Sequence, residues 1–362
     1  MPEVRILADD LTGALDAAAP FAAAAEPLPV LWPPAMPPAR GRFAYDSESR
    51  DGGDVRALIE ALPGPGLAFK KIDSLLRGST IDEIRACVAS GLFPSVVIAP
   101  AFPAQHRITR GGRQLFRRGH SWPEVPADLH AVVEHPSALR RTDAARGLQG
   151  HGVFLCDAST EGDLEAIAAA APALAGPILW VGTAGLAFAL AGPGGRPPVP
   201  EGPLLIVVGS HHPMTLIQVD ALTNARPELV VRIEPGAPVE PAVDAVAGRL
   251  RDGGLGALVF GFPDGTGAEV AGPVFDAAFA LLADRLARPG SMLVTGGSTL
   301  YRLVRALGAD ALRVEGEWQP GIPISTLTGS PWDGTRIVSK SGGFGADIVL
   351  LQLVREIEEA RP

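Results

Sequence analysis

Short apolar segments alternate with longer helical patterns along the first half of the chain. The strand-like segments are 4–7, 42–45, 67–72, 95–99, 153–156 and 178–181. Helical patterns lie between them, and Thr80-Ile-Asp-Glu83 has the form of a capping box that predicts a helix from there to Gly91. This alternation predicts βαβ units, and therefore a mainly parallel sheet flanked by helices in an α/β fold.

The second half repeats the rhythm. Strand-like segments are expected at 204–208, 229–233, 257–260, 291–295 and near 337–340, with helices at 243–251 and 269–287. The halves are separated by Ala191–Pro203, a stretch rich in Pro and Gly without any apolar period, which is typical of a linker. We therefore expect two α/β domains, 1–195 and 203–362. Residues 27–38 are expected to form a Pro-rich loop, and 113–149 show little pattern.

Composition excludes several classes of protein. The net charge is −9 over 362 residues, and no basic block is present, so nucleic acid is not expected as a partner. The segment 166–195 has no charged residue, but Pro172, Gly176 and Pro177 interrupt it, which argues against a membrane span. Two cysteines cannot build a disulfide framework. No secretory signal pattern precedes Val4, and we expect a cytoplasmic protein.

Two glycine-rich turns in the second half predict a phosphate site. Gly296, Gly297, Ser298 and Thr299 join an apolar strand to a helix, and Lys340 precedes Gly342 and Gly343 in a similar turn. Such turns leave backbone N–H groups free to bind an anion, and the helix dipole favours it. A single Gly-Gly turn is ordinary punctuation in an α/β fold. Neither a GxxxxGK[ST] loop nor a GxGxxG after a strand occurs.

Polar residues of the first half follow the predicted strands. They are Asp9, Asp10, Ser49, Arg50, Lys71, Asp73, Ser74 and Arg77, with Phe102, Gln105, His106 and Arg107 after the next strand. Ligands of open α/β sheets bind at this edge, and carboxylates with cations suit a small polyhydroxylated anion. The alternatives are helix capping for Asp9-Asp10 and surface ion pairing for Lys71, Asp73 and Arg77.

Ser210-His211-His212 follows a strand without the GxSxG pattern of a nucleophilic serine, and adjacent histidines at a helix start point apart, which disfavours a metal site. A turn that contacts a phosphate or a base is the favoured interpretation.

The chain resembles the four-carbon acid sugar kinase family, ATP-dependent kinases of tetronates and 3-oxo-tetronates. The matching stretches are ILADDLTGALDAA, DSESR, KKIDSLLRGS, APAFPAQHRITRGG, VVGSHHPMTLIQ, LVTGGSTLYRLVRALG, GEWQPGIPISTL and IVSKSGGFGADIVLLQL. The resemblance implies an N-terminal acid-sugar domain and a C-terminal nucleotide domain. It places ATP against Ser210, the Gly296–Thr299 turn and Gly342 with its neighbours. It places the substrate against Asp9, Asp10, Lys71, Asp73 and Arg77. The chain departs from the family in being shorter than typical members, in the segment 121–136, and in Ser298, where many members have Glu.

The sequence thus predicts a kinase that transfers the γ-phosphoryl group of ATP, with Mg²⁺, to a hydroxyl of threonate, erythronate or a 3-oxo-tetronate. Asp10 and Asp73 are both candidates for the base that accepts the hydroxyl proton. The alternatives are a kinase of another polyol or hydroxy acid, and a sensor that binds a sugar acid or nucleotide without transfer. No nucleic acid or membrane partner is expected, and a homodimer is compatible with the pattern.

Overall fold

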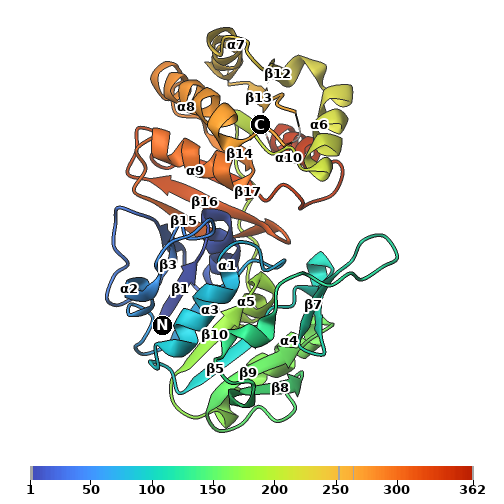
Figure 1. Cartoon of the computed structure of the whole chain (residues 1–362). Helices are drawn as coiled ribbons and strands as arrows, with labels where there is room; N and C mark the ends of the chain where they lie inside the picture. Colours follow the sequence, from blue (N-terminus) through green and yellow to red (C-terminus); the bar gives the residue numbers. More distant parts are fainter. Residues whose placement is uncertain (1–2, 252, 264, 361–362) are drawn as a thin grey trace. The chain divides into compact units, whose positions relative to one another are not determined.

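The computed structural model describes residues 3–251, 253–263 and 265–360. The chain divides into two compact units, Met1–Gly195 and Arg196–Pro362, called here the N-terminal and C-terminal units (Figure 1). Each contains a sheet flanked by helices, so the predicted α/β class with mainly parallel sheets is confirmed. In the part of the chain that is described, no helix is long and apolar enough to cross a membrane.

The sheet of the N-terminal unit is parallel at each pairing between its described strands. Its order is β2 (Leu28–Leu31), β3 (Phe43–Asp46), β1 (Val4–Ala8), β4 (Leu67–Lys71), β10 (Ile178–Gly182), β5 (Ser95–Ala99), β9 (Gly152–Asp157) and β8 (Leu139–Asp143). Because these strands run in one direction, their carboxyl ends share one edge. The turns after β1, β3 and β4, three adjacent strands, therefore lie side by side.

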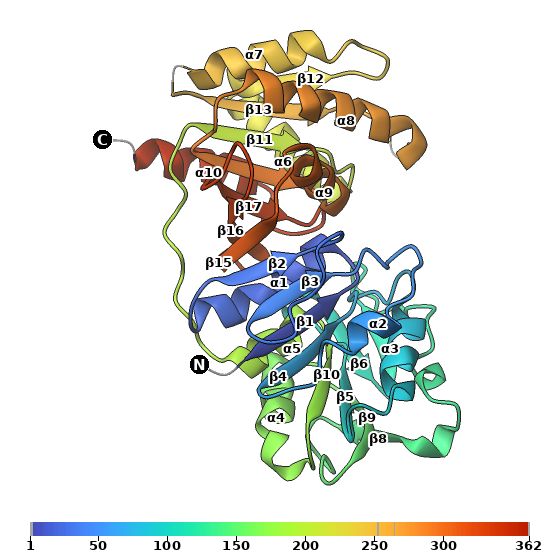
Figure 2. The ribbon, with the colours of Figure 1, turned by 90° about the vertical axis from the view of Figure 1, so that its left-hand side faces the viewer.

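Helices cover both faces of this sheet (Figure 2). On one face lie α1 (Leu11–Ala23), α4 (Glu161–Ala169) and α5 (Ala184–Ala191); on the other lie α2 (Arg56–Ile59) and α3 (Thr80–Ala89). Alternate side chains of each strand face opposite ways, so Leu7 and Tyr45 pack with Ile84 of α3 in one core cluster. The hairpin β6 (Arg107–Arg110) and β7 (Arg113–Phe116) and four short 3-10 turns complete the described unit: η1 (Pro103–Gln105), η2 (Leu129–Val132), η3 (Pro136–Ala138) and η4 (Ala171–Ala173).

The C-terminal unit has a mixed sheet. Its order is β12 (Val230–Ile233), β13 (Leu255–Phe260), β11 (Leu204–Val208), β14 (Ser291–Thr295), β17 (Arg336–Lys340), β16 (Ile322–Thr328) and β15 (Ala311–Gln319). Strand β16 runs antiparallel to both of its neighbours. Two groups of helices flank the sheet: α6 (Pro213–Ala225) with α10 (Val349–Glu359), and α7 (Glu240–Arg251) with α8 (Ala268–Arg285) and α9 (Gly297–Ala306); η5 (Pro227–Leu229) follows α6.

The structure corrects three expectations about elements. Residues 27–38 are not all loop, because Leu28 and Val30 are buried in β2, whose four residues are too few for a detectable period. Strands β15 and β16 lie in a stretch where the sequence pattern predicted nothing. The last helix begins at Val349, several residues after the glycine turn, so residues 341–348 are a loop.

The capping box predicted at Thr80–Glu83 is wrong. Helix α3 does begin at Thr80, but its N-cap is Ser79, which makes no side-chain cap bond. The Thr80 hydroxyl donates to the Arg77 carbonyl at 2.7 Å. The Glu83 carboxylate instead pairs with the Lys70 ammonium at 2.5 Å, and both side chains are buried. An available buried cation is a stronger partner for this carboxylate than a backbone N–H at the helix start.

Candidate functional site

Arg50 joins three carboxylates at the carboxyl edge of the N-terminal sheet. Its Nε donates to Asp9 Oδ2 at 2.8 Å, and its Nη1 donates to Asp10 Oδ2 at 2.6 Å. Its Nη2 lies 3.7 Å from Asp73 Oδ1. Asp9 and Asp10 come from the end of β1, and Asp73 follows β4. Burial works against the charged guanidinium, but the carboxylates outweigh it and raise the pKa of Arg50. The structure therefore brings together four of the residues that the sequence predicted.

Asp10 caps α1 and belongs to this cluster at the same time. Its Oδ1 accepts from the Gly13 N–H at 2.8 Å, and its Oδ2 accepts from the Thr12 hydroxyl at 2.7 Å. Its side chain is 20% exposed, against 2% for Asp9 and 6% for Asp73. The capping alternative is therefore real, but it does not exclude a role in binding or chemistry. Asp10 is the carboxylate of the three that solvent reaches best.

Asp73 is fully engaged by its own turn. Its Oδ2 accepts from the Leu75 N–H at 3.0 Å, the Arg77 N–H at 3.1 Å and Arg77 Nε at 3.0 Å. Its Oδ1 accepts from Arg77 Nη2 at 2.6 Å. Burial alone would raise the pKa of Asp73, but Arg77, Arg50 and Lys71 together hold it below its usual value. A carboxylate with these partners is a poor proton acceptor.

Asp9 keeps one oxygen without a partner. Within the described residues, Asp9 Oδ1 is buried and accepts no hydrogen bond. Burial would raise its pKa, yet Arg50, Lys71 and Lys70 lower it, so the carboxylate stays charged. The Lys71 ammonium donates to the Ile72 carbonyl at 2.9 Å and lies beside α1, where a Cβ built on Gly13 would be 3.0 Å from Nζ. A charged oxygen without a donor at this edge is suited to a substrate hydroxyl.

Contacts within the protein engage the side chain of Ser49 and the backbone of Ser74, the two serines predicted at this edge. Ser49 is buried; its hydroxyl donates to the Glu83 carboxylate and lies 2.7 Å from the Ser47 hydroxyl. These contacts order the turn after β3. The backbone carbonyl of Ser74 accepts from Gln114 Nε2 at 2.9 Å, which fixes the turn after β4.

Two functional candidates, Asp46 and Asp16, were not predicted as site residues from the sequence. Asp46 ends β3, and its pKa is raised to about 8, mainly by burial. Asp16 lies in α1, where burial raises the pKa to about 7 against the opposing charge of Lys71. Arg107, which the sequence placed at this edge, lies near Asp73 and Arg77, and burial lowers the pKa of its guanidinium. A signal for Asp16 was present in the sequence, since it is the one charged residue of the α1 segment.

The glycine turns of the C-terminal unit meet at adjacent strand ends. Strands β11, β14 and β17 are neighbours, with Val208 beside Thr295 and Thr295 beside Lys340. The turn after β14 is fixed by the Gly296 N–H, which donates to the Lys340 carbonyl at 2.9 Å.

Ser210 follows β11 and lies between the two glycine turns. A Cβ built on Gly296 would be 3.3 Å from Ser210 Cβ, and one built on Gly342 would overlap the Ser210 hydroxyl. The structure therefore brings together Ser210, Gly296 and Gly342, as predicted for a single site.

The turn into α9 has the backbone of an anion site. Gly296 has φ +96°, which favours glycine, and α9 begins at the next residue. The first-turn N–H groups of Gly297, Ser298 and Thr299 precede the first intrahelical donor, Leu300. The Lys340 ammonium, expected nearby as a cation, is 1% exposed and donates to carbonyls of the following loop.

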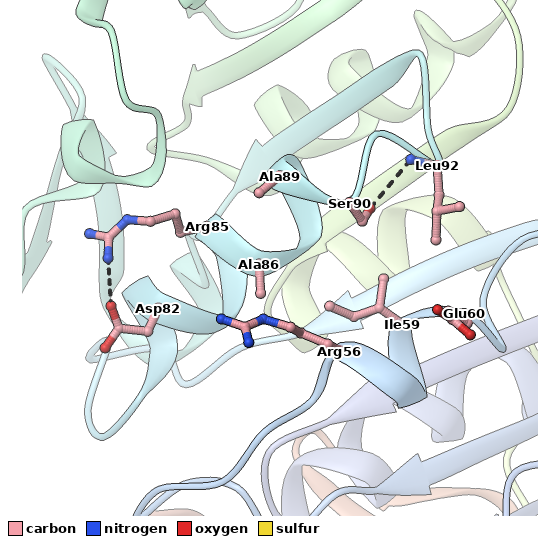
Figure 3. A pocket seen from close by; sticks show the side chains of 9 residues that line it. All are labelled: Arg56, Ile59, Glu60, Asp82, Arg85, Ala86, Ala89, Ser90 and Leu92. Atoms are coloured by element: carbon pink, nitrogen blue, oxygen red, sulfur yellow. Dashed lines mark hydrogen bonds and ion pairs between the residues drawn. The ribbon is translucent and has the colours of Figure 1, made fainter.

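A hollow of about 500 Å³ between α2 and α3 contains none of the predicted residues (Figure 3). Some of the polar side chains that line it already bind each other; for example, Arg85 Nη1 donates to Asp82 Oδ1 at 2.8 Å. We therefore place no function there.

Among the described residues, no group of three His, Cys, Asp or Glu side chains is placed to hold a metal ion.

Family models match both units of the chain. A model described as a sugar-binding N-terminal domain matches residues 4–126 and 117–190, and one described as a nucleotide-binding C-terminal domain matches residues 205–350.

The chain is 32% identical to a D-threonate kinase of Cupriavidus necator, with 98% of each chain covered. It is 30% identical to a D-threonate kinase of Bordetella bronchiseptica, over 99% of this chain and 98% of that one. A D-erythronate kinase of Heliobacterium modesticaldum is 27% identical, with 95% and 94% covered. Among solved structures, a protein of Salmonella typhimurium superposes with a TM-score of 0.72 at 20% identity, covering 98% of this chain and 99% of that one. That likeness concerns the fold alone.

Proposed function

The chain belongs to the family of four-carbon acid sugar kinases, and from this premise we propose that it phosphorylates a hydroxyl of a threonate, using ATP. The observation that carries the proposal is the arrangement of Asp9, Asp10 and Asp73 around Arg50 at one sheet edge. The two D-threonate kinases that are 32% and 30% identical over nearly the whole chain support threonate over erythronate, since the D-erythronate kinase is 27% identical.

The proposed binding mode assigns the cations to the substrate carboxylate and the carboxylates to its hydroxyls. Arg77 and Lys71 flank the carboxylates at the end of β4, and Arg107 adds a third positive charge. Guanidinium groups bind carboxylates in two-point fashion, which fixes the orientation of a small acid. The free oxygen of Asp9 is then available to accept from a substrate hydroxyl.

The proposed reaction forms one bond and breaks one. The substrate hydroxyl oxygen attacks the γ-phosphorus of ATP, the bond from that phosphorus to the bridging oxygen breaks, and ADP leaves. The hydroxyl proton passes to a carboxylate of the protein. Phosphoryl transfer asks little covalent chemistry of an enzyme, so positioning and charge stabilisation supply most of the rate.

We assign the proton acceptor as Asp10. Asp73 has four donors on its two oxygens and a lowered pKa, so it has little capacity to take a proton. Asp9 is only 2% exposed, so solvent reaches it less well than Asp10. Asp10 is more exposed than either, and the cap that it forms with Gly13 holds its carboxylate in one orientation.

The C-terminal unit supplies the proposed ATP site. The N–H groups of Gly297, Ser298 and Thr299 at the start of α9, together with Ser210 and Gly342, are assigned to the phosphates. Mg²⁺ is proposed to arrive with ATP as its phosphate complex. When bound, it would neutralise phosphate charge.

The test is ADP release from Mg·ATP with a panel of acids: both enantiomers of threonate and erythronate, 3-oxo-tetronates, and longer aldonates as controls. We expect the highest kcat/KM for a threonate and a phosphomonoester in the ³¹P spectrum of the product. ADP release with none of the four-carbon acids would refute the proposal. A higher kcat/KM for an erythronate would refute the choice of substrate but not the family reaction.

A further inference from the structure

The glycine loop after β17 is held from inside by three side chains. We call residues 341–346 the phosphate loop, since they include Gly342 and Gly343. Lys340 Nζ donates to the carbonyls of Ser341, Gly342 and Phe344 at 3.0, 3.1 and 3.0 Å. The three hydrogens of an ammonium group match these three acceptors.

Helix α6 holds the same loop from its own buried face. Gln218 Nε2 donates to the carbonyls of Phe344, Gly345 and Ala346 at 3.1, 3.3 and 2.9 Å. Thr215 Oγ1 donates to the Gly342 carbonyl at 2.8 Å. Thr215, Gln218 and Lys340 are all at most 1% exposed. Five carbonyls of one short loop are thereby bound by side chains that solvent does not reach.

This inward binding sets the direction of the loop's N–H groups. In a trans peptide unit the C=O and N–H bonds point in opposite directions. Because the carbonyls of Ser341 and Gly342 point to Lys340 and Thr215, the N–H groups of Gly342 and Gly343 point away from them. Within the described part of the chain, neither N–H has an acceptor. The loop therefore presents donors on its outer side, the arrangement that binds phosphate oxygens.

The charge of Lys340 adds to this effect. No carboxylate lies within ion-pair distance of its ammonium in the described residues, and burial lowers its pKa to about 7. An anion bound on the outer side of the loop would favour the charged ammonium.

We propose that Thr215, Gln218 and Lys340 are positioning residues for ATP: they fix the carbonyls of the phosphate loop inward so that its N–H groups bind the nucleotide phosphates. The inference rests on the proposed function, because it takes ATP as the ligand of this loop. It adds a role that sequence reasoning did not assign to Thr215 or Gln218, and it gives Lys340 the task of shaping the loop rather than touching the phosphate.

The test uses two substitutions that keep side-chain size, Gln218→Met and Thr215→Val, in the full chain. Each has a matched control: Gln352→Met, where Gln352 Nε2 bonds Glu356 Oε1 on α10, and Thr223→Val, where Thr223 Oγ1 bonds the Val219 carbonyl on α6. Calorimetry gives the dissociation constants for ATP and for adenosine, kinetics gives KM for the acid sugar, and thermal unfolding gives Tm.

We expect Gln218→Met to weaken ATP binding by about tenfold or more, which corresponds to about 1.4 kcal/mol, and Thr215→Val to weaken it by a few fold. Adenosine affinity and KM for the acid sugar should stay within about twofold of the wild type, because only phosphate contacts are lost. Both controls should bind ATP as the wild type does. A loss of ATP affinity without a loss of adenosine affinity distinguishes a positioning role from a general loss of structure.

Wild-type protein that does not bind ATP would refute the proposed function and this inference with it. Wild-type protein that binds ATP, with Gln218→Met and Thr215→Val binding it equally well, would refute the inference alone. Parallel losses of ATP and adenosine affinity would also refute it, since they indicate a structural role. If Gln218→Met does not fold, Thr215→Val decides, because it removes the hydrogen bonds of Thr215 Oγ1 to the Gly342 carbonyl and the Ser210 hydroxyl but no buried volume.

Discussion

Asp10→Asn and Asp73→Asn form a matched pair that tests the assignment of the base. Both substitutions keep the shape of the side chain and remove the charge. Asn is as good an N-cap as Asp, so the bond from the Gly13 N–H to position 10 should persist. We expect Asp10→Asn to lose about 10²–10⁴-fold in kcat, the range typical of a general base. KM for ATP should not change, because proton transfer belongs to the transition state.

The structure indicates how much stability each substitution removes. At position 10 the loss is one partly exposed ion pair with Arg50, about 1 kcal/mol or less, since Arg50 keeps Asp9. At position 73 the two-point pair with Arg77 is weakened inside a turn that two backbone N–H groups also hold. Hydrogen bonds to a charged group contribute about 1.5–3 kcal/mol. Asp73→Asn should therefore lower Tm more than Asp10→Asn, and kcat less.

The assay is steady-state ADP release at saturating ATP and acid sugar, with Tm measured on the same preparations. A ranking in which Asp73→Asn loses more kcat than Asp10→Asn, while Tm of both stays near the wild type, would refute the assignment of Asp10. A loss below about tenfold in kcat for both would show that neither carboxylate is the base.

Three further predictions concern single residues. Gly296→Ala forces a side chain into a backbone with φ +96°, at about 1–3 kcal/mol, and should raise the dissociation constant for ATP about tenfold with KM for the acid sugar unchanged; equal ATP affinity would contradict it. Arg77→Lys should raise KM for the acid sugar about tenfold with little change in kcat, since the proposed two-point contact with the substrate carboxylate is lost and the positive charge stays. A selective loss of kcat would contradict this prediction. The pKa of Asp46 is raised from 3.8 to about 8 in the folded protein. Its contribution to the free energy of unfolding is therefore greatest below pH ~4, and it is lost as the pH rises through 8. Asp46→Asn should therefore raise Tm relative to the wild type more at pH 9 than at pH 5, and an equal shift at both would contradict it.

The sequence predicted most of the parallel strands because they are apolar runs with clear boundaries, whereas the parallel strand β8, LRRTD, lies in the segment 113–149 and was not predicted. Segments such as 95–99 and 291–295 are buried over their whole length, and the structure has β5 and β14 at these bounds. Strand β2 escaped because Pro29 is unfavourable in a strand, and only tertiary packing reveals that Leu28 and Val30 are buried. Strands β15 and β16 stabilise each other through antiparallel pairing, and the local pattern of apolar and polar residues does not predict this pairing.

The candidate site could be predicted as a set of residues but not as a set of roles. Asp9, Asp10, Arg50 and Asp73 were found because ligands of α/β sheets bind where parallel strands end. Which oxygen is free depends on hydrogen bonds between residues about forty positions apart, such as Arg50 with Asp9. Thr215 and Gln218 lie on the buried face of α6 although both are polar, so no apolar pattern marks them as buried, and their meeting with residues 342–346 depends on how α6 packs under the loop.

Lys70 and Lys71, adjacent residues at the end of β4, act on opposite sides of the sheet. Because neighbouring residues of a strand face opposite ways, Lys70 reaches Glu83 of α3, while Lys71 runs beside α1 and acts on Asp16. A deletion or insertion of one residue in β4 would exchange the two positions and leave both charges on the wrong side. In a deep mutational scan, changes at Lys70 should reduce the amount of protein in the cell, whereas changes at Lys71 should reduce growth on the acid sugar at normal protein levels. Two chemically identical neighbours would then be under separate kinds of selection.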